Sequence, residues 1–227
     1  MKKLVIFAVT AFLAMIAGVG MDAQTISTTR FGVFGGYTSS KATGSKSELA
    51  DFTTGKMPLY QAGITAEFPI TASFFLQPSV AWQVKGATLT QTLGGTLPLG
   101  TYKARMGYLE GSLQLQYGPD LLLFRPYALV EPFVGVGLTA KSQVGDLTVT
   151  DISQAGLSRV EFGTGVGLGV EIWHLQVAFK WFWNFGNLYS EKNTSAEEAI
   201  VAQGIKGAFE KGGNFRGFTV SLAWFLF

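Results

Sequence analysis

Apolar and polar residues alternate with a period of two over several stretches of the chain, which is the pattern of a β-strand with two different faces. The pattern is clearest at residues 159–172, where the even positions are nearly all apolar and the odd positions are glycines between Glu161 and Glu171. A row of alternate glycines is poor material for a solvated sheet face. It fits the crowded interior of a narrow barrel whose outer face is apolar.

Eight segments of this kind are expected along the chain. They cover residues 30–39, 61–68, 74–85, 102–117, 125–140, 159–172, 175–185 and 215–227. In the fourth segment the apolar residues move from even to odd positions, so a β-bulge is expected near Gly107. The last segment is apolar on both phases, which leaves either face open to point inward.

Long and short connections alternate between these segments. The long ones are residues 40–60, 86–101, 141–158 and 188–214, and the short ones are 69–73, 118–124 and 173–174. This alternation, with both chain ends on the short side and an even number of strands, is typical of outer-membrane barrels. Within the last long loop, residues 195–209 carry a capping-box pattern that is compatible with either a short helix or an irregular loop.

The N-terminus has the features of an export signal. Lys2 and Lys3 form a basic start, a largely apolar stretch follows, and small residues come next. This pattern predicts a secretory signal peptide over residues 1–23, with cleavage after Ala23; the alternative is a retained transmembrane anchor. No other segment is a continuous apolar helix of membrane length, so residues 24–227 can enter a membrane only as a closed barrel.

Composition supports this assignment. Hydrophobic residues make up 48% and charged residues 14% of the chain, which excludes intrinsic disorder. The formal charge of +2 comes without any Lys/Arg cluster, so we expect no nucleic-acid partner. The chain has no cysteine and one histidine, which excludes disulfides and thiol chemistry and makes a His-based metal site improbable.

We therefore predict an all-β fold: a single closed, eight-stranded, antiparallel transmembrane barrel in an up-and-down meander. Four long loops would be extracellular and the short turns periplasmic, in a bacterial outer membrane. The expected partners are outer-membrane lipids, the barrel-insertion machinery, and other envelope or secretion proteins.

The chain resembles the eight-stranded outer-membrane barrels of the OmpA/OmpX type and, more closely, the PorT-like family. The PorT-like resemblance lies in residues 108–113, Tyr-Leu-Glu-Gly-Ser-Leu, followed by the Arg-Pro-Tyr of residues 125–127 and the Val-Gly-Val-Gly of residues 134–137. A proline that the family carries after the glutamate is absent here. The terminal Phe227 is similar to the signature read by the insertion machinery. The resemblance implies an accessory role in secretion or envelope assembly.

Three motifs invite a catalytic or cofactor interpretation. Residues 135–140 match a dinucleotide fingerprint but lack the helix that it requires. His174, Glu171 and Ser158 could form a hydrolase only if the two ends of one strand met, and these lie roughly 45 Å apart at about 3.3 Å per residue. Glu161 and Glu171 could act as an acid/base pair, although buried carboxylates also need cations for structural reasons. The sequence therefore predicts no catalytic, cofactor-binding or metal-binding residue.

Charged residues can instead fill the lumen with ion pairs. Those expected to be able to face inward are Glu67, Glu110, Glu131, Glu161, Glu171, Lys85, Lys103, Arg105, Arg159, Lys180 and Arg216. A barrel of eight strands is just wide enough for side chains to fill, which argues against a general pore. The chain is thus predicted to be a non-enzymatic barrel with a structural or interaction role. The alternatives are an enzyme acting on lipid A or phospholipid, and a barrel that carries a small hydrophobic ligand.

Overall fold

The computed structural model describes residues 29–43, 51–93, 97–119, 121, 123–144, 147–149, 158–186 and 214–226. The predicted signal peptide, the segment at residues 195–209 and the terminal Phe227 lie outside these ranges. Within them, ten strands form one antiparallel sheet. No helix in the described ranges is long and apolar enough to cross a membrane.

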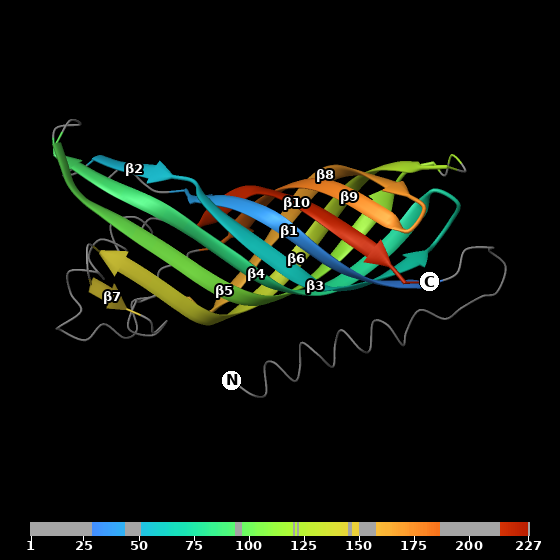
Figure 1. Ribbon diagram of the computed structural model, residues 1–227, viewed down its shortest axis with the longest axis horizontal. Coiled ribbons are helices and arrows are strands. Elements are labelled where there is room, and N and C mark those ends of the chain that lie inside the picture. Colours follow the sequence, from blue (N-terminus) through green and yellow to red (C-terminus); the bar gives the residue numbers. More distant parts are fainter. Residues whose placement is uncertain are drawn as a thin grey trace.

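Eight of the strands close into a barrel (Figure 1). They are β1 (Arg30–Ala42), β3 (Met57–Pro69), β4 (Phe74–Leu93), β5 (Leu97–Tyr117), β6 (Arg125–Val144), β8 (Val160–Ile172), β9 (Leu175–Phe185) and β10 (Phe215–Phe225). Each pairs with the next in this order, and β1 pairs with β10 through eleven residues to close the sheet. The predicted eight-stranded antiparallel meander is confirmed.

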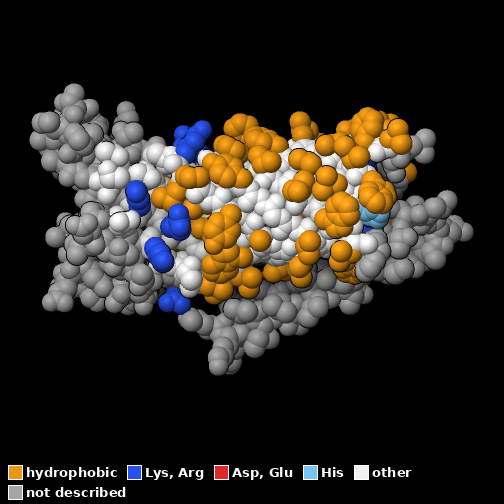
Figure 2. Space-filling model, in the orientation of Figure 1, with side chains coloured by type: hydrophobic (Ala, Val, Ile, Leu, Met, Phe, Trp, Pro, Cys, Tyr) orange, Lys and Arg blue, Asp and Glu red, His pale blue; other side chains and the backbone are white. Residues whose placement is uncertain are grey.

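The barrel is apolar outside and polar inside, which reverses the usual arrangement of a soluble protein. On β8, Leu168 is 67% exposed whereas Glu161 is 1% exposed. β4 and β9 follow the same rule, with Gln83 and Gln176 buried and Trp181 exposed. Apolar side chains spread over the middle of the barrel surface (Figure 2). This exterior matches a hydrocarbon environment and contradicts a soluble barrel with an apolar interior.

The barrel wall is taller on one side because β4 and β5 run further than predicted. Residues 86–101, expected to be a loop, are mostly strand: Gly86–Leu93 continue the ladder opposite residues 97–105. The short strand β2 (Asp51–Gly55) extends this sheet beside β4, and β7 (Leu147–Val149) extends it beside β6. These strands project beyond the barrel at the end away from the C-terminus (Figure 1). The threonines and glycines there lack an apolar alternation, so the ladder was not visible in the sequence.

The predicted bulge lies opposite Gly107, but on the neighbouring strand. Gly107 pairs with Thr139 and Tyr108 pairs with Gly137, so the extra residue is Leu138 of β6. From Ala104 to Gln116, β5 keeps one phase, and its even residues face inward. The prediction was wrong about the strand because Met106 and Tyr108 are apolar yet lie fully buried in the lumen.

The structure shows which face of the last strand points inward, a question that the sequence left open. Phe215, Thr219 and Phe225 of β10 are buried, while Leu222 and Trp224 are exposed. Odd positions therefore face the lumen. Arg30 lies over the Phe225 ring at 4.7 Å from its centroid, which gives this buried aromatic ring a polar neighbour.

The glycine row of β8 faces the lumen and makes room for its neighbours. A Cβ on Gly163 would lie 2.2 Å from the carbonyl oxygen of Trp183 and 2.4 Å from the Phe133 ring. A Cβ on Gly169 would lie 2.2 Å from the Tyr127 ring. The row thus lets adjacent strands approach and lets large lumen side chains cross the narrow interior.

Gly163→Ala should destabilise the barrel by about 1–3 kcal/mol, because the added methyl group meets backbone and a packed ring. Gly111→Ala is the matched control, since its Cβ would have no neighbour closer than 4.0 Å. The measurement is the urea midpoint of the heat-modifiable band in a gel. Equal midpoints for the two variants would contradict the close approach at Gly163.

Candidate functional site

Four charged side chains form a closed ring in the lumen near the end that holds the short turns. Arg125 contacts Glu67 at 2.6 Å and Glu171 at 2.5 Å. Arg30 contacts the same two carboxylates from the other side, at 2.6 Å to Glu171 and by a short hydrogen bond to Glu67. Cations and anions alternate around this ring, so its formal charge is zero.

The ring joins opposite walls of the barrel. Arg30 is the register partner of Glu67 on β1 and β3, and Arg125 is the register partner of Glu171 on β6 and β8. β4 and β5 separate these two strand pairs on one side, and β9 and β10 separate them on the other. The ion pair between two register partners therefore forms between adjacent strands. The contacts from one of these ion pairs to the other cross the lumen.

Neighbouring polar and aromatic groups complete this layer. Arg125 also donates to Gln116 at 2.9 Å and stacks over the Phe75 ring at 3.8 Å from its centroid. Gln176 donates to both Glu67 and Glu171. Buried ions need such additional hydrogen bonds to offset the loss of water.

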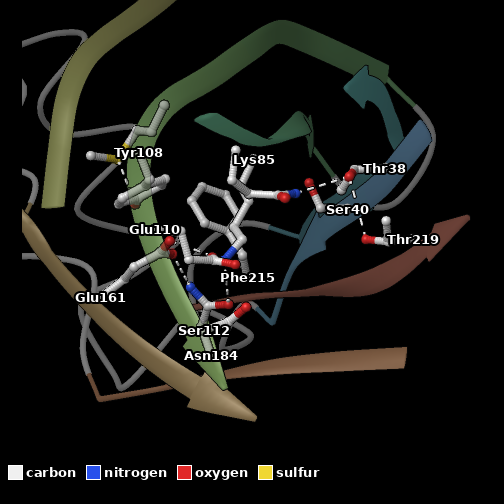
Figure 3. Close-up of polar contacts among 12 residues, drawn as sticks. Thr38, Ser40, Lys85, Tyr108, Glu110, Ser112, Glu161, Asn184, Phe215 and Thr219 are labelled. Carbon is white, nitrogen blue, oxygen red and sulfur yellow. Dashed lines mark hydrogen bonds and ion pairs between the residues drawn. The ribbon is translucent and has the colours of Figure 1, made fainter. Parts of the chain in front are cut away.

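A second layer is centred on Lys85 of β4, which is 1% exposed. Its Nζ donates to Glu110 at 2.6 Å, to Glu161 at 3.0 Å and to Asn184 at 3.5 Å. Asn184 in turn donates a short hydrogen bond to Glu161. Figure 3 shows Lys85 and Asn184 directed toward the two carboxylates. The ammonium group thus bridges β5 and β8.

Aromatic rings surround the same ammonium group. Its Nζ lies 4.1 Å from the Phe133 centroid, 5.1 Å from that of Phe182 and 5.6 Å from that of Tyr108. Such ring faces attract a desolvated cation. Phe182 of β9 is itself buried at this level of the lumen.

A small cavity separates the two layers. It has a volume of about 40 Å³ and is lined in part by Gln77, Glu131 and Lys180. Lys180 donates a short hydrogen bond to Glu131, and Gln114 donates to the same carboxylate at 3.3 Å. A space of this size holds about two or three water molecules and no larger ligand.

The five glutamates predicted to be able to face inward all do so, together with Lys85 and Lys180. Three predicted cations are instead exposed on the outside, namely Lys103, Arg105 and Arg216. Arg159 directly precedes β8 at the long-loop end of the barrel and is partly exposed. The error arose because these cations were assigned to the lumen by charge alone, although their strand phase points outward.

Sequence reasoning missed the two arginines of the ring, Arg30 and Arg125. Both are the first residues of their strands, where the side-chain phase is hardest to assign. A signal was present for Arg125, which lies six residues before Glu131 and therefore shares its face of β6. Arg30 had no such signal, because its neighbour Glu67 is set by the register between β1 and β3.

The motifs with catalytic interpretations are kept apart by the fold. Ser158 precedes β8 and His174 follows it, so the two lie at opposite ends of that strand. His174 packs instead against Trp173 and Trp224, with centroid distances of 4.4 and 6.1 Å. Glu161 and Glu171 belong to different layers.

The cofactor and metal interpretations can be placed in the same way. The glycines of the dinucleotide-like motif lie inside β6, which continues as a strand to Val144, where the fingerprint would require a helix. In the described ranges no three Asp, Glu, His or Cys side chains group as metal ligands. The arrangement of lumen charges is thus a set of internally paired ions.

An apolar outer surface around a charged, filled lumen defines a transmembrane β-barrel of the outer-membrane class. A family described as outer membrane protein beta-barrel domain matches residues 22–190, and the chain belongs to this family. It is a bacterial outer-membrane protein. No curated protein matches the chain.

Several solved barrels are similar to this chain in overall outline. Neisserial surface protein A has 13% identity and a TM-score of 0.43, covering 87% of this chain and 99% of its own. Ail, the attachment invasion locus protein of Yersinia pestis, has 8% identity and a TM-score of 0.40, with coverages of 88% and 100%. OprG from Pseudomonas aeruginosa has 13% identity and a TM-score of 0.41, with coverages of 87% and 94%.

Arg125→Leu should lower the stability of the barrel by about 3–5 kcal/mol, because it leaves Glu67 and Glu171 buried with one shared cation instead of two. Urea unfolding followed by the heat-modifiable gel shift measures this loss. Lys103→Gln on the exposed face of β5 is the control and should change stability by less than about 0.5 kcal/mol. Similar losses for the two variants would show that the ring contributes nothing beyond any surface charge.

Proposed function

We propose that this protein is a non-conducting, non-enzymatic barrel that holds an interaction surface at the outer membrane. The observation that carries the proposal is the lumen, where Lys85 and Arg125 each bridge two carboxylates from strands that do not pair with each other. The paired ions fill the lumen at two levels, and each of the five glutamates whose side chains are described contacts a lysine or an arginine. The interior therefore acts as a rigid support, and binding falls to the segments outside it.

The projecting hairpin of β4 and β5 is the part of the barrel wall best suited to contact a partner protein. Its ladder continues beyond the level of Lys85 and is flanked by β2. A stiff sheet that extends past the barrel presents a surface without the entropy cost of ordering a loop. We propose that this hairpin is the main contact site for a partner.

The PorT-like resemblance supports a secretion or envelope-assembly protein as the partner. Residues 108–113 lie on β5 and residues 125–127 and 134–137 on β6, and these two strands pair in the barrel. The resemblance supports an accessory role in secretion or envelope assembly. An enzyme acting on lipid A or phospholipid would need a polar cluster at one rim, which the separation of Ser158 from His174 does not favour.

The reconstituted protein should give no steady ion conductance in a planar lipid bilayer, because both charged layers block the lumen. The double variant Lys85→Ala with Phe182→Ala removes the centre of one layer and serves as the comparison. Reproducible conductance steps from the unaltered protein would refute the filled-lumen proposal.

Shortening the hairpin tests the contact site. Thr88 and Lys103 face each other in the ladder, so residues 89–102 can be replaced by a two-residue Asn-Gly turn. We expect the shortened protein to keep its heat-modifiable shift in the gel but to leave the larger complex in mild-detergent native electrophoresis. An unaltered protein that migrates as a monomer, or a complex that survives the shortening, would contradict the proposal.

A further inference from the structure

Basic side chains gather on the outside of the barrel at its long-loop end. Among the described residues they are Lys41, Lys56, Lys103, Arg105, Lys141 and Arg216, all at least partly exposed. The five glutamates whose side chains are described all lie in the lumen. Lys and Arg side chains form a row along one edge of the apolar surface (Figure 2). Among the side chains that the structure describes, the charged groups on this outer surface are thus all positive.

Four of these cations form two like-charged pairs across neighbouring strands. Lys41 of β1 is the register partner of Arg216 of β10, and Arg105 of β5 is the register partner of Lys141 of β6. Both members of each pair point outward. Like charges directly opposite each other destabilise a sheet, and the ion pairs of the lumen include none of these four residues.

Each pair has a further cation beside it. Lys103 lies two residues from Arg105 on the same face of β5. Lys56 precedes β3, which pairs with β1, and its Nζ lies 5.9 Å from the centroid of the outward-facing Phe218. The cations are therefore gathered into two groups, on β10–β1–β3 and on β5–β6, with β4 between them on one side and β8 and β9 on the other.

Apolar side chains continue directly from both groups toward the middle of the barrel. From Arg216 toward the middle of the barrel, β10 exposes Val220 and Leu222. From Lys141 toward the middle of the barrel, β6 exposes Leu138 and Val134. Each group therefore combines clustered positive charge at the edge of the apolar surface with a strip suited to hydrocarbon chains. This combination matches an amphiphile with an anionic head group and acyl chains.

We propose that each like-charged pair binds a phosphate group of lipid A in the outer leaflet. A phosphate placed between the two side chains accepts hydrogen bonds from both and turns their repulsion into two attractions. The arginine of each pair offers a planar fork that fits phosphate oxygens, while the lysine adds a point charge. The acyl chains then lie along the apolar strip of the same strands. The two sites are equivalent in chemistry and lie on different parts of the circumference.

The test counts bound lipid by native mass spectrometry of the protein in zwitterionic detergent, with diphosphorylated lipid A as the probe. The unaltered barrel should retain two lipid A molecules. Lys41→Gln with Arg216→Gln should retain one, as should Arg105→Gln with Lys141→Gln, and the quadruple variant none. The charge-preserving exchange Lys41→Arg with Arg216→Lys is the matched control and should retain two. Loss of one charged pair should weaken binding at its site about tenfold or more.

A second measurement separates binding from folding. Without lipid A, the glutamine variants should be at least as stable as the unaltered barrel, because they relieve a repulsion. With lipid A bound, the unaltered barrel should be more stable than the glutamine variants. Equal retention of dephosphorylated lipid A, or preferential retention of phosphatidylglycerol, would overturn the assignment to lipid A phosphates. Undiminished lipid A binding by the quadruple variant would overturn the two sites. None of these outcomes depends on the conductance or the hairpin contacts of the proposed function.

Discussion

The absence of hydrogen-bond partners in the hydrocarbon of a membrane is the constraint on which the rest of this structure depends. Every backbone N–H and C=O inside that layer must be satisfied by the chain itself. The eleven-residue ladder between β1 and β10 meets the requirement by removing both edges of the sheet. Closure with eight strands then leaves a lumen so narrow that glycines on β8 must face large side chains, and the lumen must be filled rather than open.

Filling a narrow space inside a membrane protein with ions is costly unless each ion is paired. Two cations satisfy this condition in different ways. Arg125 uses the planar geometry of its guanidinium to reach Glu67 and Glu171 at once, with an aromatic ring beneath it. Lys85 is a point charge, and it sits between two carboxylates and three ring faces. Both layers tie together parts of the wall that share no backbone ladder.

Much of the fold was accessible from the sequence, because the period-two pattern marks strands whose two faces meet different solvents. The apolar outer face and the glycine-rich inner face of β8 were predicted in this way. The pattern failed where an apolar residue faces the lumen, as Met106 does, since lipid-facing and lumen-facing positions then look alike. It also missed the projecting hairpin of β4 and β5 and the pairing of Arg30 with Glu67. Both depend on which strands are neighbours in the sheet and on the register between them. Charge alone was equally uninformative for Lys103 and Arg105, which face out.

The lumen charges are also distributed in a way that bears on how such a barrel assembles. Arg30 and Glu67 lie on β1 and β3, Lys85 and Glu110 on β4 and β5, and Arg125 and Glu171 on β6 and β8. Each of these hairpins carries its own ion pair. A growing sheet can thus neutralise these charges one hairpin at a time, before the first and last strands meet. Arg30, Lys85 and Arg125 can therefore each enter the membrane beside a carboxylate of their own hairpin. Glu131 and Glu161 of the third hairpin instead depend on Lys180 of β9 and Lys85 of β4, so their pairing needs strands outside that hairpin.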